Sequence, residues 1–556
     1  MLLFIALFAV IFFIGEKIFP DNPFHNNPLS EKKARCLLIC TGIYFLFVLI
    51  SGILSENKDV VLWGIHTEYE GMMAIFSYCI VFLTGYNYCG INEVRKFYKK
   101  AFFALILIVS LLALFEYIHT PLMELPFMKY IIAPAEYRDI MNNITSANDF
   151  RESVLMFYNS NYMGSFCTII FPVSFYYVIS AFTNKDIKKS IISFIVLLLV
   201  FIAVITSNST ASFYIAVFEA SMLIFMFAIK KCIILKHKIV YGLISFALVM
   251  AVNFASGNEF IGTVIKSMRN SGTYQTTSNV FEIDEISVSE NSVNFRSKDS
   301  EYQIKLPVNE NEVMTISGIN NTTFEKILMD KNIINITDIN SGADINAFLS
   351  EGILYLDLGY KSTVDFAVTT SGVKAIVQNA KLIDKIPFSI FNGTKLSKFY
   401  SIATGRGYIW LNTLPILKDC IIKGKGAGNF PFYFIQNDIA GLFNAHGTYR
   451  LIIDKPHNWY LQIAVTAGIP ALIAVLILFV MFFISGVKLF INASPEDFKK
   501  NSDNIFIICL FTGLFGFMLT GIVNDSIVSV NPFFWFNFGI AFYWLNNTKN
   551  RKKDKE

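Results

Sequence analysis

About eleven apolar runs, each long enough to cross a lipid bilayer, constrain this chain more than any other feature of its sequence. A helix needs about 20 mostly apolar residues to span roughly 30 Å of hydrocarbon. Runs of about this length lie at residues 1–19, 36–54, 70–87, 101–118, 162–182, 189–206, 210–229, 239–255, 468–491, 504–523 and 531–545. Of the 556 residues, 54% are hydrophobic and only 16% are charged, which leaves too little polar surface for a soluble globule. The sequence therefore predicts an α-helical polytopic membrane protein.

The charged residues between these runs give a separate prediction of topology. Lysine and arginine gather in every second loop, at residues 32–35, 95–100, 185–189, 230–238, 488–500 and 549–553. Because basic loops stay on the cytoplasmic side, we expect the N-terminus outside and the C-terminus inside. The first run lacks a basic segment before it and is expected to remain as a span. The net charge of +4 is too small to indicate a nucleic-acid partner.

The longest outward-facing loop contains a segment whose hydrophobic pattern changes from helical to alternating. Between residues 281 and 386, short alternating stretches such as 302–306 and 353–358 are separated by Asn, Gly, Ser and Asp, which is typical of a small antiparallel β-sandwich. The expected organisation is transmembrane helices at 1–256, a connector at 257–280, a β-rich extracytoplasmic insert at 281–386, an extracytoplasmic loop that carries the chemistry at 387–460, transmembrane helices at 461–547 and a basic cytoplasmic tail at 548–556.

Polar and basic residues concentrate at 404–469, between the insert and the next apolar run. An enzyme outside the cell has no supply of nucleotides, so group transfer there usually draws on a substrate activated inside and carried across on a lipid. A polyprenyl-diphosphate sugar would need a cation for its diphosphate. The guanidinium of Arg406 suits that role, although an ordinary surface arginine explains it equally. His457 suits a general base, although a lone histidine at a membrane surface is more often structural, and His446 lies nearby.

Three motifs in this loop, in their order and spacing, resemble the O-antigen ligase/polymerase family of bacterial membrane glycosyltransferases. They are Arg-Gly-x-x-Trp at 406–410, Gly-x-Gly-x-Gly-x-Phe at 424–430 and Asp-Lys-Pro-His-Asn-x-Tyr-Leu-Gln at 454–462. The resemblance extends to residues 68–71, 158–164 and 524–526, each on a predicted outer face, and it does not cover the β-rich insert. It implies a C-type glycosyltransferase-like helix bundle in a bacterial plasma membrane.

The resemblance also implies a reaction and roles for named residues. The reaction is inverting transfer of a glycan from undecaprenyl diphosphate to an acceptor hydroxyl on a glycan or lipid, without nucleotide or metal. Arg406 would bind the diphosphate and His457 would orient or deprotonate the acceptor. Further substrate contacts are expected from a set of polar residues in the outer loops: Glu70, Arg151, Asn161, Lys425, Lys455, Asn458, Asn524 and Asp525. The family's Ser-Arg near the seventh span is Ser209-Thr210 here, which leaves the source of a second cation open.

Other functions remain open from the sequence. Glu70 could instead serve as the carboxylate base of a glycosyltransferase that uses a polyprenyl-phosphate sugar, with helix capping as the simpler role for Glu68. Glu219 lies within an apolar run, where an ionisable side chain indicates function or a hydrogen bond between helices. A transporter of lipid-linked glycans should show several such charges and two matching halves. A sensor would need a cytoplasmic output domain, which the lysine-rich tail is not.

Overall fold

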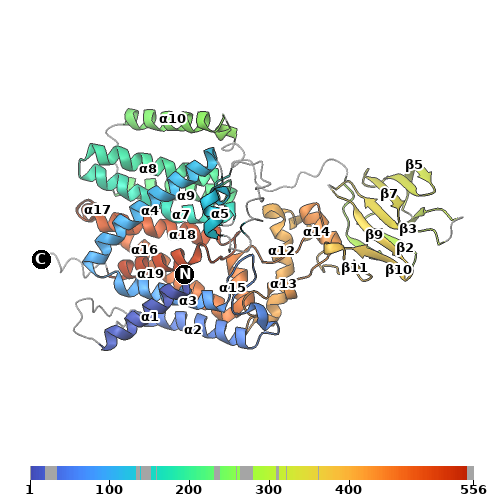
Figure 1. The fold of residues 1–556 in the computed structure, drawn as a ribbon, viewed down its shortest axis with the longest axis horizontal. Helices are drawn as coiled ribbons and strands as arrows, with labels where there is room; N and C mark the ends of the chain where they lie inside the picture. Colours follow the sequence, from blue (N-terminus) through green and yellow to red (C-terminus); the bar gives the residue numbers. More distant parts are fainter. Residues whose placement is uncertain are drawn as a thin grey trace. The chain divides into compact units, whose positions relative to one another are not determined.

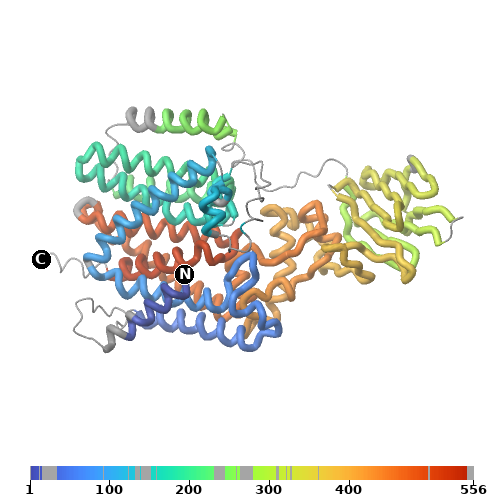
Figure 2. The backbone as a smooth tube through the Cα atoms, viewed as in Figure 1, coloured from blue at the N-terminus to red at the C-terminus, as the bar shows by residue number. Residues whose placement is uncertain are grey.

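The computed structural model divides the chain into a helical unit and a loop unit. It describes residues 2–18, 34–119, 121–132, 138, 152–157, 159–230, 238–257, 259–262, 280–308, 312–320, 322–360 and 362–547. The helical unit comprises residues 1–270, 421–428 and 458–556, and the loop unit comprises residues 271–420 and 429–457. Figures 1 and 2 trace the chain through both units. Arg151, most of the predicted connector and the basic tail lie outside the described residues.

Helices form at every apolar run that the sequence predicts. Seven of them are long and apolar enough to cross a membrane: α2 (Ala34–Ile53), α4 (Asn92–Ile118), α7 (Ser160–Thr183), α8 (Ile187–Thr206), α9 (Thr210–Ile229), α16 (Ile469–Asn492) and α18 (Ser502–Thr520). The other four runs form α1 (Leu2–Ile18), α3 (Met72–Tyr88), α10 (Lys238–Ala255) and α19 (Asn531–Asn546). These four helices are not among the seven candidates, so the predicted count of eleven spans is not confirmed. Short helices α5 (Pro126–Ile132), α15 (Trp459–Ala467) and α17 (Pro495–Lys500) connect them.

Helices α3 and α19, from opposite ends of the sequence, lie side by side in the helical unit (Figure 1). Each presents a glycine to the backbone of the other. A Cβ atom on Gly85 would lie 2.3 Å from the carbonyl oxygen of Phe536, and one on Gly539 would lie 2.1 Å from that of Phe82. Small residues of this kind let two helices in a membrane approach closely and gain dispersion energy over a long contact.

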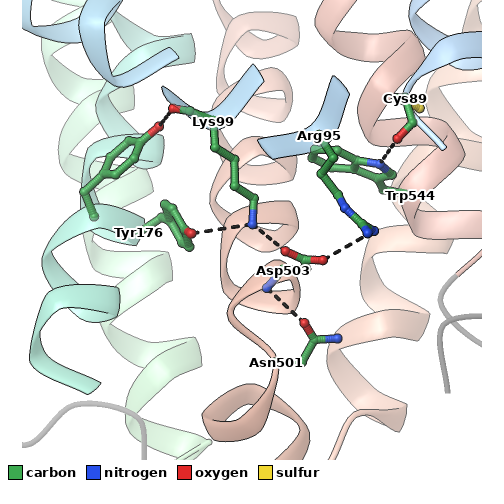
Figure 3. Close-up of polar contacts among 8 residues, drawn as sticks. Cys89, Arg95, Lys99, Tyr176, Asn501, Asp503 and Trp544 are labelled. Carbon is green, nitrogen blue, oxygen red and sulfur yellow. Dashed lines mark hydrogen bonds and ion pairs between the residues drawn. The ribbon is translucent and has the colours of Figure 1, made fainter. Parts of the chain in front are cut away.

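A charged cluster joins the beginnings of α4 and α18 (Figure 3). Asp503 accepts from Lys99 and lies 3.4 Å from the guanidinium of Arg95, and its own N–H is capped by Asn501. Both basic residues come from a loop that the charge pattern assigns to the cytoplasm, and Asp503 follows Lys499 and Lys500 in another such loop. The contact places these two loops at the same end of the helical unit, as the predicted alternation requires.

The β-rich part of the loop unit consists of two antiparallel sheets in which every strand pairs with its neighbour in sequence. Strands β1 (Glu285–Val288), β2 (Ser292–Arg296), β3 (Glu301–Lys305) and β4 (Thr315–Ile319) form one sheet, and β5 (Phe324–Asp330), β6 (Ile333–Asp338), β7 (Asp344–Ser350), β8 (Ile353–Asp357), β9 (Val364–Thr369), β10 (Gly372–Ile376) and β11 (Leu382–Ile383) form the other. One face of each sheet is buried, and Tyr302 of β3 donates a hydrogen bond of 2.5 Å to Asp338 of β6. The structure therefore confirms a separate antiparallel sheet domain in the segment predicted to be β-rich.

The helical part of the loop unit is held together by a buried carboxylate. It contains α12 (Ile402–Leu417), α13 (Phe430–Tyr433) and α14 (Ile439–His446). Asp438 caps α14 and accepts hydrogen bonds from Tyr408 of α12 at 2.9 Å and from Asn392 at 2.9 Å. Burial raises the pKa of Asp438, and the hydrogen bonds that it accepts oppose that shift. Tyr408 lies two residues after Arg406, so this contact fixes the segment of α12 that carries the predicted cation.

Replacing Gly539 with alanine should destabilise the protein, whereas the same change at Gly42 should not. The Cβ of Gly539→Ala meets a backbone oxygen that cannot move aside, and overpacking of this kind typically costs about 1–3 kcal/mol. No heavy atom of the described chain lies within 4 Å of a Cβ on Gly42, where alanine should gain helix propensity. The test measures the thermal unfolding midpoint of both variants in detergent and the amount of each variant in the membrane. Equal midpoints for the two variants would contradict the close α3–α19 packing.

Candidate functional site

In the loop unit, α12 carries the predicted cation and contacts the backbone of the predicted base. Arg406 and Trp410 are four residues apart on this helix and therefore share a face. The indole N–H of Trp410 donates to the backbone carbonyl of His457 at 3.3 Å. Two residues that are 51 positions apart in the sequence, Arg406 and His457, thus belong to one local structure. The sequence motifs predicted both residues but not this connection.

The backbone on both sides of this contact adopts left-handed conformations. Ala403, Thr404 and Gly405 have φ of 52°, 62° and 91°, and His457 has φ of 48°. Residues with a side chain adopt this region at a cost of order 1–3 kcal/mol, and such residues cluster at functional sites. The conformation at 403–405 bends the chain immediately before Arg406. We infer that packing of the surrounding loop, including the Trp410 contact, holds His457 in its unfavourable conformation.

A second histidine lies against the bend. A Cβ on Gly405 would come within 2.2 Å of the imidazole of His446, so only glycine fits there. Burial, and secondarily the charge of His457, lower the pKa of His446 to about 4. Its Nε2 is buried and has no hydrogen-bond partner among the described residues. His446 is therefore neutral at physiological pH, and its ring lies against Gly405, the residue before Arg406.

Lys455, another predicted substrate ligand, also lies in the loop unit. Its side chain is only 6% exposed, and its ammonium lies 3.7 Å from the carboxylate of Asp454. This carboxylate offsets part of the cost of burying the ammonium. Lys455 is two residues before His457, so a cation is present in the same segment as the predicted base.

In the helical unit, a cluster of buried polar side chains surrounds Glu70. Its carboxylate accepts hydrogen bonds from the hydroxyl of Ser526, from Gln462 at 3.0 Å and from Asn531 at 3.3 Å. Gln462 also donates to Glu68 at 3.3 Å, and its oxygen accepts from the N–H of Ser526 at 2.7 Å. The cluster joins the loop before α3, helix α15 and the link between α18 and α19. The charge pattern of the sequence predicts that these segments lie at the outer side of the membrane.

Asn161, Asn524 and Asp525 lie among the same loops. Asn524 donates to the hydroxyl of Ser165 at 3.0 Å, and that hydroxyl donates to the carbonyl of Asn161. The side chain of Asn161 accepts from Ser209 at 3.1 Å. Asp525 is 7% exposed and directly precedes Ser526 of the Glu70 cluster. Glu70, Asn524 and Asp525 are thus buried and Asn161 is half-buried, and the hydrogen bonds of Glu70, Asn161 and Asn524 run to other polar residues of the helical unit.

Asn458 and Lys425 have clear structural roles. The Asn458 side chain caps α15 by accepting from the N–H of Leu461 at 2.9 Å, and it donates to the carbonyl of Ile522 at 2.8 Å. In the glycine-rich turn, the N–H groups of Gly424, Lys425 and Gly426 bond to Ser51, Val465 and Thr466, respectively. Those three amides are therefore not available to a phosphate, and only the side chain of Lys425 keeps a possible ligand role.

Glu219 lies in the middle of α9 and is fully buried. Neither of its carboxylate oxygens has a hydrogen-bond partner among the described residues, and one of them occupies the space beside Gly516 of α18. The expected hydrogen bond to a neighbouring helix is thus not formed within the described part of the chain. Arg151, the predicted second arginine, lies outside the described residues.

The sequence analysis assigned no role to Gln462, which donates to Glu70 and Glu68, or to Asp438, which joins α12 to α14 in the loop unit. Gln462 ends the His-Asn-x-Tyr-Leu-Gln motif and lies between apolar residues of α15. A polar side chain in such a stretch could have indicated a buried hydrogen bond. Asp438 begins a helix as an N-cap, a common role for aspartate, and the residues around it do not indicate the contact with Tyr408.

No protein-family model, no characterised protein and no solved structure matches this chain.

The stability of the loop unit should fall between pH 7.5 and pH 5 because of His446. Its folded pKa of about 4 is below the value of about 6.5 in an unfolded chain, so acid protonates the unfolded state first. This difference amounts to about 2 kcal/mol over that interval. Pulse proteolysis of the full chain in urea measures the free energy of unfolding at the two pH values. The loss of stability from pH 7.5 to pH 5 should be smaller for His446→Asn than for the natural protein. Equal losses would contradict a buried, neutral imidazole.

Glu70→Gln should destabilise the helical unit although it preserves the size of the side chain. The introduced amide group would face hydroxyl and amide donors, and leaving such buried groups unpaired costs about 1–3 kcal/mol. Glu56, an exposed glutamate in the same loop, provides the control, since Glu56→Gln should change stability by less than about 0.5 kcal/mol. Thermal unfolding in detergent compares them, and an unchanged Glu70→Gln midpoint would exclude a role for this cluster in packing.

Proposed function

We propose that the protein is a membrane glycosyltransferase of the O-antigen ligase or polymerase type. It transfers a glycan from an undecaprenyl-diphosphate donor to an acceptor hydroxyl during synthesis of cell-surface polysaccharide, on the outer side of a bacterial plasma membrane. The proposal rests on the sequence resemblance and on the seven apolar helices. The single structural observation that supports it is the hydrogen bond from Trp410 to the carbonyl of His457, which connects the base to the helix of Arg406.

The proposed reaction is a displacement at the anomeric carbon of the donor. The acceptor oxygen forms a bond to that carbon, while the bond between the carbon and the diphosphate oxygen breaks with its electron pair. The hydroxyl proton passes to the imidazole of His457, and the released undecaprenyl diphosphate carries the additional negative charge. Arg406 stabilises that charge as it develops, because a guanidinium offers two parallel donors and stays protonated.

His446 is the second candidate for the base. It is neutral, its Nε2 has no partner among the described residues, and it packs against Gly405 beside Arg406. The lowered pKa of His446, about 4, makes it a weak base, since proton transfer is most effective when the pKa of the base lies near the working pH. We therefore assign the proton transfer to His457 and give His446 the role of positioning the Arg406 segment.

A carboxylate-base glycosyltransferase that uses a polyprenyl-phosphate sugar is the second candidate function. The buried carboxylate of Glu70, assembled from three separate segments, is the observation in its favour. Against it, both oxygens of Glu70 already accept hydrogen bonds from Ser526, Gln462 and Asn531, so neither oxygen is left without a protein donor. A lipid-linked glycan transporter would instead rely on ionisable groups within spans, for which Glu219 is the candidate.

Cells that carry Arg406→Ala or His457→Ala should lose long surface polysaccharide chains and accumulate lipid-linked repeat units. Loss of a positioned group that stabilises developing charge typically lowers the rate by about 10²–10³-fold. Arg406→Lys should restore only part of the activity, because an ammonium is a point charge without the planar fork. The measurement is gel separation of surface polysaccharide together with quantification of the lipid-linked donor.

Two controls make this test specific. Arg296→Ala removes an arginine of the β-sandwich that is half exposed and paired with Glu285, and it should leave chain length unchanged. Membrane levels of every variant must equal those of the natural protein. Normal polysaccharide in both Arg406→Ala and His457→Ala cells would exclude the proposed site. Loss of chains only in a Glu70→Ala variant of normal abundance would favour the carboxylate-base enzyme.

A further inference from the structure

The outer face of the seven-stranded sheet carries an exposed aromatic pair at its centre. Side chains alternate along each strand, so Ile334, Ala347 and Leu354 face the buried side, and their neighbours in sequence face outward. Phe348 of β7 is directly opposite Tyr355 of β8, and their rings stack with centroids 4.6 Å apart. Phe348 is 41% exposed and Ile333, opposite it on β6, is 39% exposed.

A row of polar side chains lies directly beside this apolar row. The register pairs Asn335 of β6 with Asn346 of β7, and Asn346 with Asp357 of β8. Neither amide side chain has a hydrogen-bond partner among the described residues. In the next row, by contrast, Thr337 donates to Asp344 at 2.8 Å. We call the six residues Ile333, Asn335, Asn346, Phe348, Tyr355 and Asp357 the platform.

We propose that the platform is a binding site for a neutral glycan chain. Sugars combine an apolar face of C–H groups with a rim of hydroxyls, and the platform offers the matching chemistry in adjacent rows. Aromatic rings supply rigid apolar contact, and each asparagine supplies both a donor and an acceptor for hydroxyls. The inference rests on the proposed function only in taking this glycan to be the polysaccharide that the enzyme builds.

The charge and size of the platform argue against other occupants. None of its six residues is basic, so it does not suit an anionic lipid surface or a nucleic acid, which are bound through lysine and arginine. Three neighbouring strands and two rows cover about 10 Å by 7 Å, whereas a stable protein interface buries roughly 800 Å² on each partner. The platform is far smaller than that interface, and its footprint is comparable with that of a short oligosaccharide.

The experiment measures binding rather than transfer. The full-length protein in lipid nanodiscs is titrated with fluorescently labelled surface polysaccharide from the source cells, cut to short chains. The double variant Phe348→Ser with Tyr355→Ser should weaken binding at least tenfold, and Asn346→Ala should weaken it severalfold. Leu382→Ser is the matched control, because Leu382 is 44% exposed on β11, an edge strand of the same sheet, and it should bind as the natural protein does.

His457→Ala separates this inference from the proposed function. Binding at the platform needs no chemistry, so this variant should bind the labelled chains normally even if it makes no polysaccharide. Unchanged binding by the folded Phe348→Ser, Tyr355→Ser double variant, or no binding by the natural protein, would overturn the platform without affecting the transferase. A change in oligomeric state caused by the double variant, with glycan binding intact, would also overturn it and indicate contact between copies of the chain.

Discussion

The hydrogen bonds accepted by Glu70 are the interaction on which the loops of the helical unit depend. Hydrogen-bond donors stabilise a buried carboxylate, because an unpaired charge in apolar surroundings is very costly. Here the donors come from Gln462, Ser526 and Asn531, which lie 392, 456 and 461 residues further along the chain. Satisfying one side chain therefore fixes the loop before α3, helix α15 and the α18–α19 link together.

The predicted base directly precedes α15 in the sequence. The Asn458 side chain caps α15 by accepting from the N–H of Leu461, and it also donates to the carbonyl of Ile522. His457 is the residue immediately before that cap, and its own carbonyl is taken by Trp410. The Trp410 contact therefore holds the backbone of His457 within the loop unit, where its φ of 48° is left-handed.

The sequence predicted the elements of this fold better than their connections. Apolar runs and alternating strands depend on local patterns, so the helices and the antiparallel sheets were predictable, whereas only seven helices of the described chain meet the length and hydropathy of a membrane span. Arg406 and His457 were found through motif resemblance, but their link through Trp410 is a long-range contact with no local signal. Asn458, predicted to contact substrate, also caps α15, a role that the motif resemblance did not indicate.

In the seven-stranded sheet, the pairing of neighbouring strands brings together side chains that no single strand contains. The alternation along β6, β7 and β8 predicts which side chains face outward, yet only the pairing places Phe348 on Tyr355 and Asn335 beside Asn346. A glycan held there need not be held tightly. A chain retained by one part of a protein remains at a high effective concentration for another part of it, so weak binding by a few rings and amides suffices to favour repeated use of the same acceptor.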